Sequence, residues 1–190
     1  PAPFLSDAEC VLTGRRILEP WLRGCLAEGI DYRGVLYPGL MIARGEAKVL
    51  EFNARFGDPE TQVYLPRLEN DLLELMVACV EGHLDRTELR WRTDAAVCVV
   101  MASGGYPGGY AKGRVIAGLK EADRLPQTKV FHAGTANVNG RIVTAGGRVL
   151  GVTAWASDLA RARDAAYAAV DRIRFDGAHF RRDIAAKALR

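Results

Sequence analysis

The sequence lacks several features that would assign it to common functional classes. It has no apolar run approaching the ~20 residues that a transmembrane helix needs, and no secretory signal is visible. It also has no Gly-x-x-x-x-Gly-Lys-Ser/Thr phosphate loop, no nucleophile elbow for Ser–His–Asp catalysis and no Cys/His spacing typical of zinc sites. We therefore expect neither a membrane protein nor a zinc or serine-hydrolase site.

Cysteine is scarce, and positive and negative charges nearly balance. The four cysteines are widely spaced and form no CxxC pair, so we expect reduced thiols in a cytoplasmic protein. The net charge of +3 is too slight to favour nucleic acid as a partner. A hydrophobic content of 49% and a charged content of 26% are typical of a soluble globular protein. The 190 residues suit one large or two small domains.

One short segment carries most of the chemical information. Glu51, Asn53 and Arg55 alternate with apolar residues, which predicts a strand with all three polar side chains on one face. A carboxylate beside a neutral amide oxygen suits Mg²⁺, which keeps its other positions for water and phosphate oxygens. A guanidinium is a bidentate anchor for carboxylate or phosphate. The pattern favours magnesium-nucleotide chemistry, although a solvated strand face would look similar.

The same segment resembles a known enzyme superfamily. Glu51-x-Asn53-x-Arg55 is similar to the metal-binding strand of ATP-grasp ligases. The octapeptide from Arg55 to Gln62 resembles the signature of one member family, the phosphoribosylamine–glycine ligases, and is far more specific than the Glu-x-Asn element alone. Other segments similar to that family are residues 31–42, 105–107, 110–113, 131–135 and 146–150.

The resemblance implies an α/β (α+β) fold. Residues 1–90 would be the rear part of an ATP-grasp domain, and residues 91–190 a small, mostly antiparallel sheet or partial barrel with helices. The family's front half, with the lobe that holds adenine and phosphates, has no counterpart in the sequence. The chain opens on Pro1-Ala2-Pro3 without Met, as expected of a segment of a longer polypeptide or of a subunit with a separate partner. We therefore expect this chain alone to be inactive.

The resemblance also implies a reaction and a role for each site residue. Family members join glycine to phosphoribosylamine with ATP, through glycyl phosphate, in de novo purine biosynthesis. Here Glu51 and Asn53 would bind Mg²⁺ or Mn²⁺, and Arg55 would clamp the transferring phosphoryl group or the acyl phosphate. Asp58 and Glu60 would bind the glycine amine or orient Arg55. The expected partners are ATP, glycine, phosphoribosylamine and the missing amino-terminal half, with neither nucleic acid nor membrane.

Alternatives to these roles stay open. Arg55 could form a structural ion pair with Asp58 or Glu60, and the two acids could instead favour the positive end of the following helix. The chain could belong to another ATP-grasp carboxylate–amine ligase with a different acceptor. It could also be a non-catalytic fragment or subunit that docks against the missing lobe, in which case an exposed apolar face would be expected on residues 1–60.

Capping and periodicity predict the elements around this segment. A capping box in residues 6–9 starts a helix that ends at Gly29 and that Pro20 should kink or split. Two antiparallel strands follow near residues 34–43 and 47–54. Proline cannot donate to a ladder, so Pro38 should lie at an edge or at a local irregularity.

Later elements are predicted in the same way. Pro59 should occupy a first helical position, and Asn70 or Asp71 should cap a helix that Gly82 ends. The predicted strands are residues 95–102, 129–132, 141–145 and 148–156, followed by a helix over residues 158–172 capped by Ser157 and a last helical turn or two within residues 180–189.

Two further features are weaker candidates. The Gly-rich loop at residues 103–110 follows a predicted buried strand, so it could hold the ribose phosphate beside Lys112. The competing interpretation, which we favour, is that the loop is a purely structural turn. His132 is expected to be a core or turn histidine with satisfied hydrogen bonds.

Overall fold

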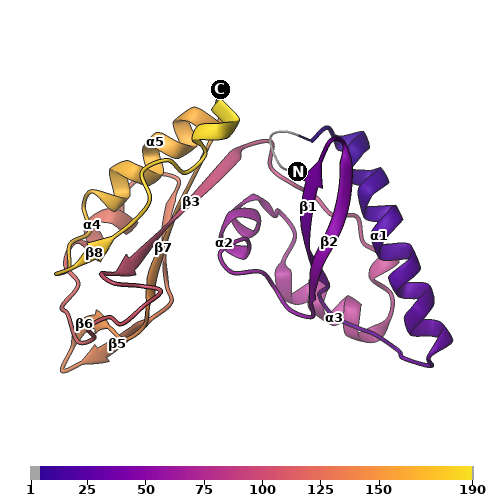
Figure 1. The fold of residues 1–190 in the computed structure, drawn as a ribbon, viewed down its shortest axis with the longest axis horizontal. Helices are drawn as coiled ribbons and strands as arrows, with labels where there is room; N and C mark the ends of the chain where they lie inside the picture. Colours follow the sequence, from indigo (N-terminus) through magenta and orange to yellow (C-terminus); the bar gives the residue numbers. More distant parts are fainter. Residues whose placement is uncertain (1–4, 190) are drawn as a thin grey trace. The chain divides into compact units, whose positions relative to one another are not determined.

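The computed structural model describes residues 5–189 and has mixed helix and antiparallel sheet content (Figure 1). The predicted α/β (α+β) fold class is confirmed. Two compact units make up the chain. The first unit runs up to Gly57 and includes Asn70–Leu89, and the second unit consists of Asp58–Glu69 and the chain from Arg90 onward.

The first unit is built from two helices, a β-hairpin and a short 3-10 turn. Its elements are α1 (Asp7–Ala27), β1 (Tyr37–Ala43), β2 (Glu46–Asn53), α3 (Leu72–Glu81) and η2 (Leu84–Arg86). The predicted capping box is confirmed, because the Ser6 hydroxyl accepts from Glu9 N while the Glu9 carboxylate accepts from Ser6 N at 2.8 Å. The helix α1 continues through Pro20 without splitting. Its C-cap is Glu28, and Gly29 follows in the left-handed conformation at φ 71°, so Gly29 ends the helix as predicted.

The hairpin of the first unit carries the segment of greatest chemical interest. Its turn places Arg44 and Gly45 at φ 53° and 77°, the pair of positive values that a type I′ turn requires. The pairing shifts register between Gly39 and Leu40, directly after Pro38. The expected irregularity at Pro38 is therefore present. Within residues 5–189, β1 and β2 pair only with each other, so both outer edges of this two-stranded sheet are open.

The hydrophobic core of the first unit is thin. Ala78 is its only buried apolar side chain in the part of the chain that is described. The 21 residues of α1 include none that is buried. Trp21 on that helix packs edge-on against Tyr32, with ring centroids 4.8 Å apart, and lies 6.2 Å from the ring of Phe52.

The second unit has a substantial core around one antiparallel sheet. Its strands are β3 (Ala95–Ser103), β4 (Thr128–His132), β5 (Thr135–Val138), β6 (Arg141–Thr144), β7 (Arg148–Ala156) and β8 (Ala178–His179). Its helical elements are α2 (Thr61–Tyr64), η1 (Leu65–Arg67), α4 (Leu119–Asp123), α5 (Leu159–Val170) and η3 (Ala186–Leu189). The sheet order is β4-β7-β3-β8, β5 and β6 form a separate hairpin, and α5 packs against β3 and β7.

Some helix boundaries differ from the sequence-based expectation. Pro59 lies in the turn before α2 instead of at its first position, and Glu60 is the N-cap. Asp71 caps α3 and Gly82 ends it in the left-handed conformation, as predicted. Asp158, not Ser157, caps α5, because its carboxylate accepts from Arg161 N at 2.8 Å. The short elements α4, β5 and β8 were not predicted; of these, β8 is held by a strand distant in sequence, β3.

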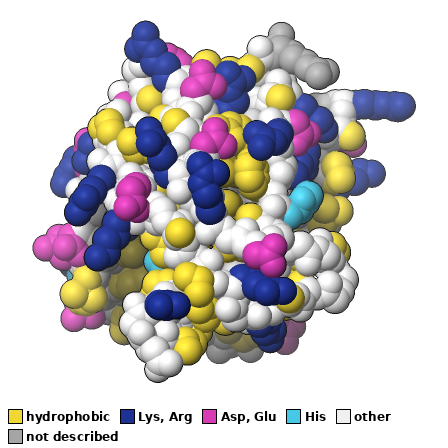
Figure 2. Space-filling view, turned by 90° about the vertical axis from the view of Figure 1, so that its left-hand side faces the viewer, with side chains coloured by type: hydrophobic (Ala, Val, Ile, Leu, Met, Phe, Trp, Pro, Cys, Tyr) yellow, Lys and Arg dark blue, Asp and Glu magenta, His cyan; other side chains and the backbone are white. Residues whose placement is uncertain are grey.

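Charges of both signs are mixed on the surface of the described residues (Figure 2). On the face seen in Figure 2, Lys and Arg side chains are dispersed among acidic and uncharged ones. In the part of the chain that the structure describes, no helix is long and apolar enough to cross a bilayer.

Candidate functional site

The end of strand β2 and the two residues after it bring the three polar residues of interest into one row, with Glu51 and Asn53 on the strand and Arg55 just beyond it. Asn53 Nδ2 donates to Glu51 Oε1 at 3.0 Å, and Arg55 Nη2 donates to Asn53 Oδ1 at 3.1 Å. Arg55 Nη1 also donates to the carbonyl oxygen of Phe56 at 2.9 Å. The row is thus a continuous hydrogen-bonded chain of carboxylate, amide and guanidinium, as expected for residues two apart on one strand face.

A glycine on the neighbouring strand leaves room for the carboxylate of this row. Gly39 pairs with Glu51 across the hairpin. A Cβ atom at Gly39 would lie 3.1 Å from Glu51 Cγ, which is tighter than ordinary carbon contacts, and 3.5 Å from Glu51 Oε1, which is an ordinary contact. The absence of a side chain at Gly39 therefore lets the Glu51 carboxylate lie over β1.

The oxygen atoms of the row fit part of a magnesium shell. Glu51 supplies a carboxylate and Asn53 an amide oxygen, and Mg²⁺ takes oxygen ligands in an octahedron while keeping several waters. The Asn53 amide turns its oxygen towards Arg55 and its nitrogen towards Glu51, so a half-turn of the amide would aim both oxygens at one ion. Across residues 5–189, no group of three or more His, Cys, Asp or Glu side chains is arranged to hold a metal.

The two acidic residues after the row lie in the second unit. The carboxylate of Asp58 is engaged at both oxygens, because Gln62 Nε2 donates to Oδ1 at 2.9 Å and Arg148 Nη2 lies 3.1 Å from Oδ2. Arg148 Nη1 also donates to the backbone carbonyl of Asp58 at 2.9 Å. Glu60 caps α2 through its backbone, with no side-chain hydrogen bond to that helix.

Arg148 is a residue that sequence reasoning did not single out. It is separated from Asp58 by 90 positions, so no local spacing connects the two. The only available signal was its place in the Gly-Gly-Arg-Val-Leu segment at residues 146–150. The Arg148 and Asp58 side chains are 42% and 46% exposed, and ion pairs in such settings contribute about 0.2–1 kcal/mol.

The surface beneath Gln62 is closely packed. A Cβ atom at Gly151 of β7 would lie 3.7 Å from Gln62 Cγ and 3.3 Å from Cys98 Sγ, so the glycine leaves space for both side chains. Burial raises the pKa of the Cys98 thiol, and the negative charges of Asp58 and Glu60 raise it further. Cys98 is therefore a neutral packing residue and not a nucleophile.

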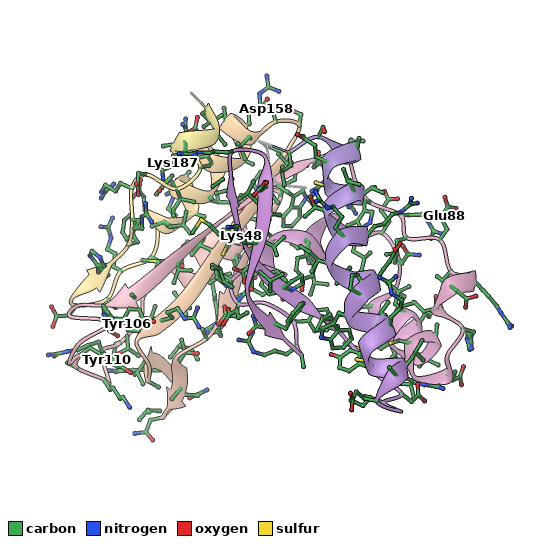
Figure 3. The ribbon with its side chains drawn as sticks, turned by 45° about the vertical axis from the view of Figure 1, so that its right-hand side comes forward. Lys48, Glu88, Tyr106, Tyr110, Asp158 and Lys187 are labelled. Atoms are coloured by element: carbon green, nitrogen blue, oxygen red, sulfur yellow. The ribbon has the colours of Figure 1, made fainter. Side chains whose placement is uncertain are left out.

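The weaker candidates have mostly structural surroundings. Ser103 Oγ donates to the Gly146 carbonyl at 2.9 Å, and the ring of Tyr106 covers Gly147, where a Cβ atom would collide with it. Tyr106 and Tyr110 lie beside each other beyond the end of β3 (Figure 3), with ring centroids 6.2 Å apart. His132 is exposed at the end of β4, and its Nδ1 lies 3.0 Å from Thr135 Oγ1, so it is a turn histidine.

Two family models match the chain. The model of the ATP-grasp (A) domain of phosphoribosylglycinamide synthetase matches residues 1–61. The model of the C domain of the same enzyme matches residues 96–187. The row on β2 lies within the first match, and Arg148 lies within the second.

Curated relatives carry one enzyme name. A phosphoribosylamine–glycine ligase of Synechocystis is 52% identical over 100% of this chain and 45% of its own length. The chloroplastic ligase of Arabidopsis thaliana is 48% identical over 100% of this chain and 36% of its own. The ligase of Vibrio cholerae is 46% identical, with coverages of 100% and 44%. The chain therefore spans less than half the length of the curated relatives it matches.

Two solved structures superpose on most of the chain. The phosphoribosylamine–glycine ligase of Thermotoga maritima superposes with a TM-score of 0.77 and 32% identity, over 96% of this chain and 44% of that one. A pyruvate carboxylase of Rhizobium etli superposes with a TM-score of 0.63 over 95% of this chain and 18% of that one. At 18% identity, this second match indicates similarity of fold alone.

Proposed function

The chain belongs to the phosphoribosylamine–glycine ligase family, and on that premise we propose that it is the carboxy-terminal part of such a ligase. The complete enzyme would join glycine to phosphoribosylamine with ATP, giving glycinamide ribonucleotide, ADP and phosphate in de novo purine biosynthesis. One observation carries the proposal. The Glu51–Asn53–Arg55 row is assembled at the end of β2 and directly after it, in a chain that aligns over its whole length with ligases of this name.

We assign the metal-binding role to the first two residues of the row. Glu51 and Asn53 would hold Mg²⁺ or Mn²⁺, and ATP phosphates and water would complete the shell because this chain offers only part of it. The ion supplies positive charge against the phosphoryl oxygens. The absence of a side chain at Gly39 leaves the space beside β1 that the Glu51 side chain occupies.

Arg55 is the catalytic residue of the proposal. Its guanidinium donates to the Phe56 carbonyl oxygen, a contact that does not depend on which way the Asn53 amide is turned, and keeps further donors for a phosphate or acyl phosphate. Preorganised positive charge of this kind favours the transition state of phosphoryl transfer, because it need not reorient as negative charge develops. Charge stabilisation and orientation of glycyl phosphate are therefore its proposed tasks.

The glycine amine is assigned to the acidic residues after the row. Asp58 and Glu60 are both carboxylates that could accept from an ammonium group. The carboxylate of Asp58 already accepts from Gln62 and pairs with Arg148, so an amine would have to replace one of these contacts. Glu60 offers its carboxylate without such a replacement and is the residue we favour.

The missing partner of the proposal is the amino-terminal part of the ligase. The first unit buries one apolar side chain, and apolar residues of its helices and hairpin are exposed in the described chain, among them Leu12, Leu26, Met41, Leu50, Leu73 and Val80. A two-stranded sheet with open edges is marginally stable by itself. More than half of each relative's length lies outside its match to this chain, which is enough to cover such a surface.

The domain division and compartment follow from the same proposal. We assign residues 1–90 to the ATP-grasp domain and residues 91–190 to the carboxy-terminal ligase domain. A cytoplasmic enzyme would suit the four cysteines, all of which are free thiols. One of the relatives is nevertheless named as chloroplastic.

The first experiment measures ADP release with Mg-ATP, glycine and phosphoribosylamine. It compares this chain alone with a mixture containing the part of the Synechocystis ligase outside the matched region. We expect glycinamide ribonucleotide and ADP only in the mixture. ADP release that depends on a different amine would favour another ATP-grasp ligase. Complex formation without ADP release would favour a non-catalytic subunit, and turnover by the chain alone would show that the other lobe is dispensable.

Variants of the row test the residue assignments in that mixture. We expect Glu51→Ala and Arg55→Ala each to lower turnover by at least about 100-fold, because each removes charge that acts on the phosphoryl group. Lys48→Ala, on the same strand (Figure 3), is the matched control and should leave turnover unchanged. Near-wild-type turnover in either row variant would refute the assignment.

A further inference from the structure

Strand β3 of the second unit has the composition of a strand from the middle of a sheet. Its nine residues, Ala95–Ser103, include no charged side chain and are mostly buried. Natural edge strands are usually short or carry charges, prolines or bulges that prevent pairing with another chain. The one register shift of β3 against β7 lies near its end, between Met101 and Ala102, so most of the strand has no such protection. The composition therefore predicts a neighbouring strand on each edge.

The structure supplies a full neighbour on one edge of β3 alone. Strand β7 pairs with it from Ala95 to Ala102. On the opposite edge, β8 pairs only with Ala102 and Ser103. In the part of the chain that the structure describes, no strand lies along that edge between Ala95 and Met101. A long apolar strand is thus left with most of one edge unpaired.

The alternation of the ladder identifies the unpaired backbone groups. Trp155 N donates to Gln127 O at 3.0 Å, so the odd-numbered residues of β7 bond towards β4. The even-numbered residues of β7 therefore bond towards β3, where the register pairs Val152 with Val99. Three residues of β3 consequently direct their N–H and C=O groups away from β7: Ala96, Cys98 and Val100. Among residues 5–189, none of the three has a backbone hydrogen bond on that side.

The carboxy-terminal segment does not complete this edge. After β8 it runs along α5 (Figure 1), where the Tyr167 hydroxyl donates to the Arg181 carbonyl at 2.8 Å and accepts from Ile184 N at 3.1 Å. The ring of Phe180 lies 6.5 Å from that of Tyr167. These contacts hold the segment over α5, so the ladder beside β3 stops at Ala102.

We propose that the open edge of β3 pairs with an extended segment of the amino-terminal part of the ligase. This inference rests on the proposed function, which supplies that part as the partner. More than half of each relative's length lies outside its match to this chain, so enough polypeptide is available. Strand addition would satisfy the N–H and C=O groups of Ala96, Cys98 and Val100. A part of the same enzyme covers the edge at any protein concentration, whereas a second copy of the chain would do so only at high concentration.

Hydrogen exchange of single amides, followed by NMR, tests the proposal directly. In the chain alone, the amides of Ala96, Cys98 and Val100 should exchange at least about 10-fold faster than those of Val97 and Val99, which bond to β7. Adding the part of the Synechocystis ligase outside the matched region should slow the three edge amides by at least about 10-fold.

A control amide lies on the other edge of the same sheet. Strand β4 forms that edge, and by the same alternation the N–H of His132 points away from β7. Because the proposed segment pairs with β3, the exchange rate of the His132 amide should not change on addition of the Synechocystis part. Slowing of this amide together with the β3 amides would indicate general stabilisation of the unit and would overturn the proposal.

The remaining outcomes also decide the proposal. Edge protection that rises with the concentration of the chain alone would show that a second copy occupies the edge. Protection in the chain alone at every concentration would show that the edge is satisfied internally. Either result, or unchanged edge amides in the complex, would overturn the proposal. If the two parts do not associate, the same rates are measured in one polypeptide in which the Synechocystis part precedes residue 1.

A substitution at the edge tests the pairing independently. Ala96→Pro removes one outward donor near the start of β3, where proline is tolerated, and spares the ladder to β7. Its affinity for the Synechocystis part should fall by at least about 10-fold, because proline also obstructs a neighbouring strand. His132→Pro, on the outer edge of β4, is the matched control and should leave the affinity unchanged.

A second variant covers the case in which Ala96→Pro does not fold. Ala96→Lys keeps the backbone donor and places a charge beside the edge, which is how natural edge strands discourage pairing. Wild-type affinity in the folded variant, with its urea midpoint preserved, would overturn the proposal. The two proposals also fail separately: product formation with unprotected edge amides would refute the strand addition alone, and protected edge amides without product would refute the proposed function alone.

Discussion

At the scale of single residues, the site depends on the absence of a side chain at Gly39. Gly39 faces Glu51 across the hairpin, and its missing side chain is what lets the Glu51 carboxylate lie over β1. Glycine inside a strand usually weakens it, so this glycine indicates a close approach. The sequence showed the alternation of Glu51, Asn53 and Arg55, but it did not show which residue would lie beneath the carboxylate.

Gly39→Ala tests this residue-scale argument. The added Cβ would lie 3.1 Å from Glu51 Cγ, so the carboxylate should move away, and the reassembled ligase should need more Mg²⁺ for half-maximal rate. Stability should change by less than about 1 kcal/mol, because a flexible side chain can give way. Gly14→Ala is the control, since nothing lies within 4 Å of a Cβ built there. An unchanged Mg²⁺ requirement in Gly39→Ala would contradict the role of this glycine.

At the scale of elements, caps and turns were the parts that sequence could predict. The Ser6–Glu9 box, the Asp71 cap and the left-handed Gly82 are all present, because each depends on a hydrogen bond or a dihedral angle within a few residues. The short helix α4 escaped prediction. Its last residue, Asp123, is tied to β4, where Oδ1 accepts from Val130 N at 3.0 Å and Oδ2 lies 3.2 Å from Lys129 Nζ.

Because of the α4–β4 contact, the free energy of unfolding should depend on pH in the acid range. The hydrogen bond from Val130 N, together with Lys129, lowers the pKa of Asp123. A carboxyl group whose pKa is lower in the folded chain stabilises the fold at pH values above its pKa in the unfolded chain, about 3.9. That contribution is lost as the pH falls through the pKa of the folded state. Urea unfolding of Asp123→Asn should therefore show a deficit above about pH 4 that shrinks at lower pH.

The expected size of the stability deficit follows from the exposure of the Asp123 side chain. The Asp123 side chain is 40% exposed, so the deficit should not exceed about 1 kcal/mol. Glu121→Gln, which removes another acidic side chain from the same helix, is the control for the loss of one negative charge from α4. An Asp123→Asn deficit that stays constant from pH 6 to pH 2.5 would contradict the electrostatic explanation.

At the scale of the whole molecule, the two units differ in how much apolar surface they bury. The core of the second unit includes Val99, Met101, Val149 and Val152, all fully buried, whereas the first unit buries only Ala78 among described apolar residues. Local stability follows buried apolar contacts. The exposed apolar side chains expected for residues 1–60 of a chain separated from its other lobe are present on α1 and the hairpin.

Hydrogen exchange tests this difference between the units. Amides of β7 should exchange at least about 100-fold more slowly than amides of β1 and β2, because an isolated hairpin opens easily. Adding the complementary part of the Synechocystis ligase should slow exchange in β1 and β2 and leave β7 unchanged. Equal protection of both sheets in the chain alone would show that the first unit is stable without a partner.

The sequence by itself determined the features that depend on near neighbours. Alternation placed Glu51 and Asn53 on one strand face, with Arg55 continuing the row, and the octapeptide from Arg55 indicated the family, because both are written in consecutive residues. Only the tertiary structure brought Arg148 to Asp58, since strand order and packing are set by the burial of side chains far apart in the chain. The candidate residues of the row could therefore be proposed from the sequence, whereas the contact between Arg148 and Asp58 was decided by the fold.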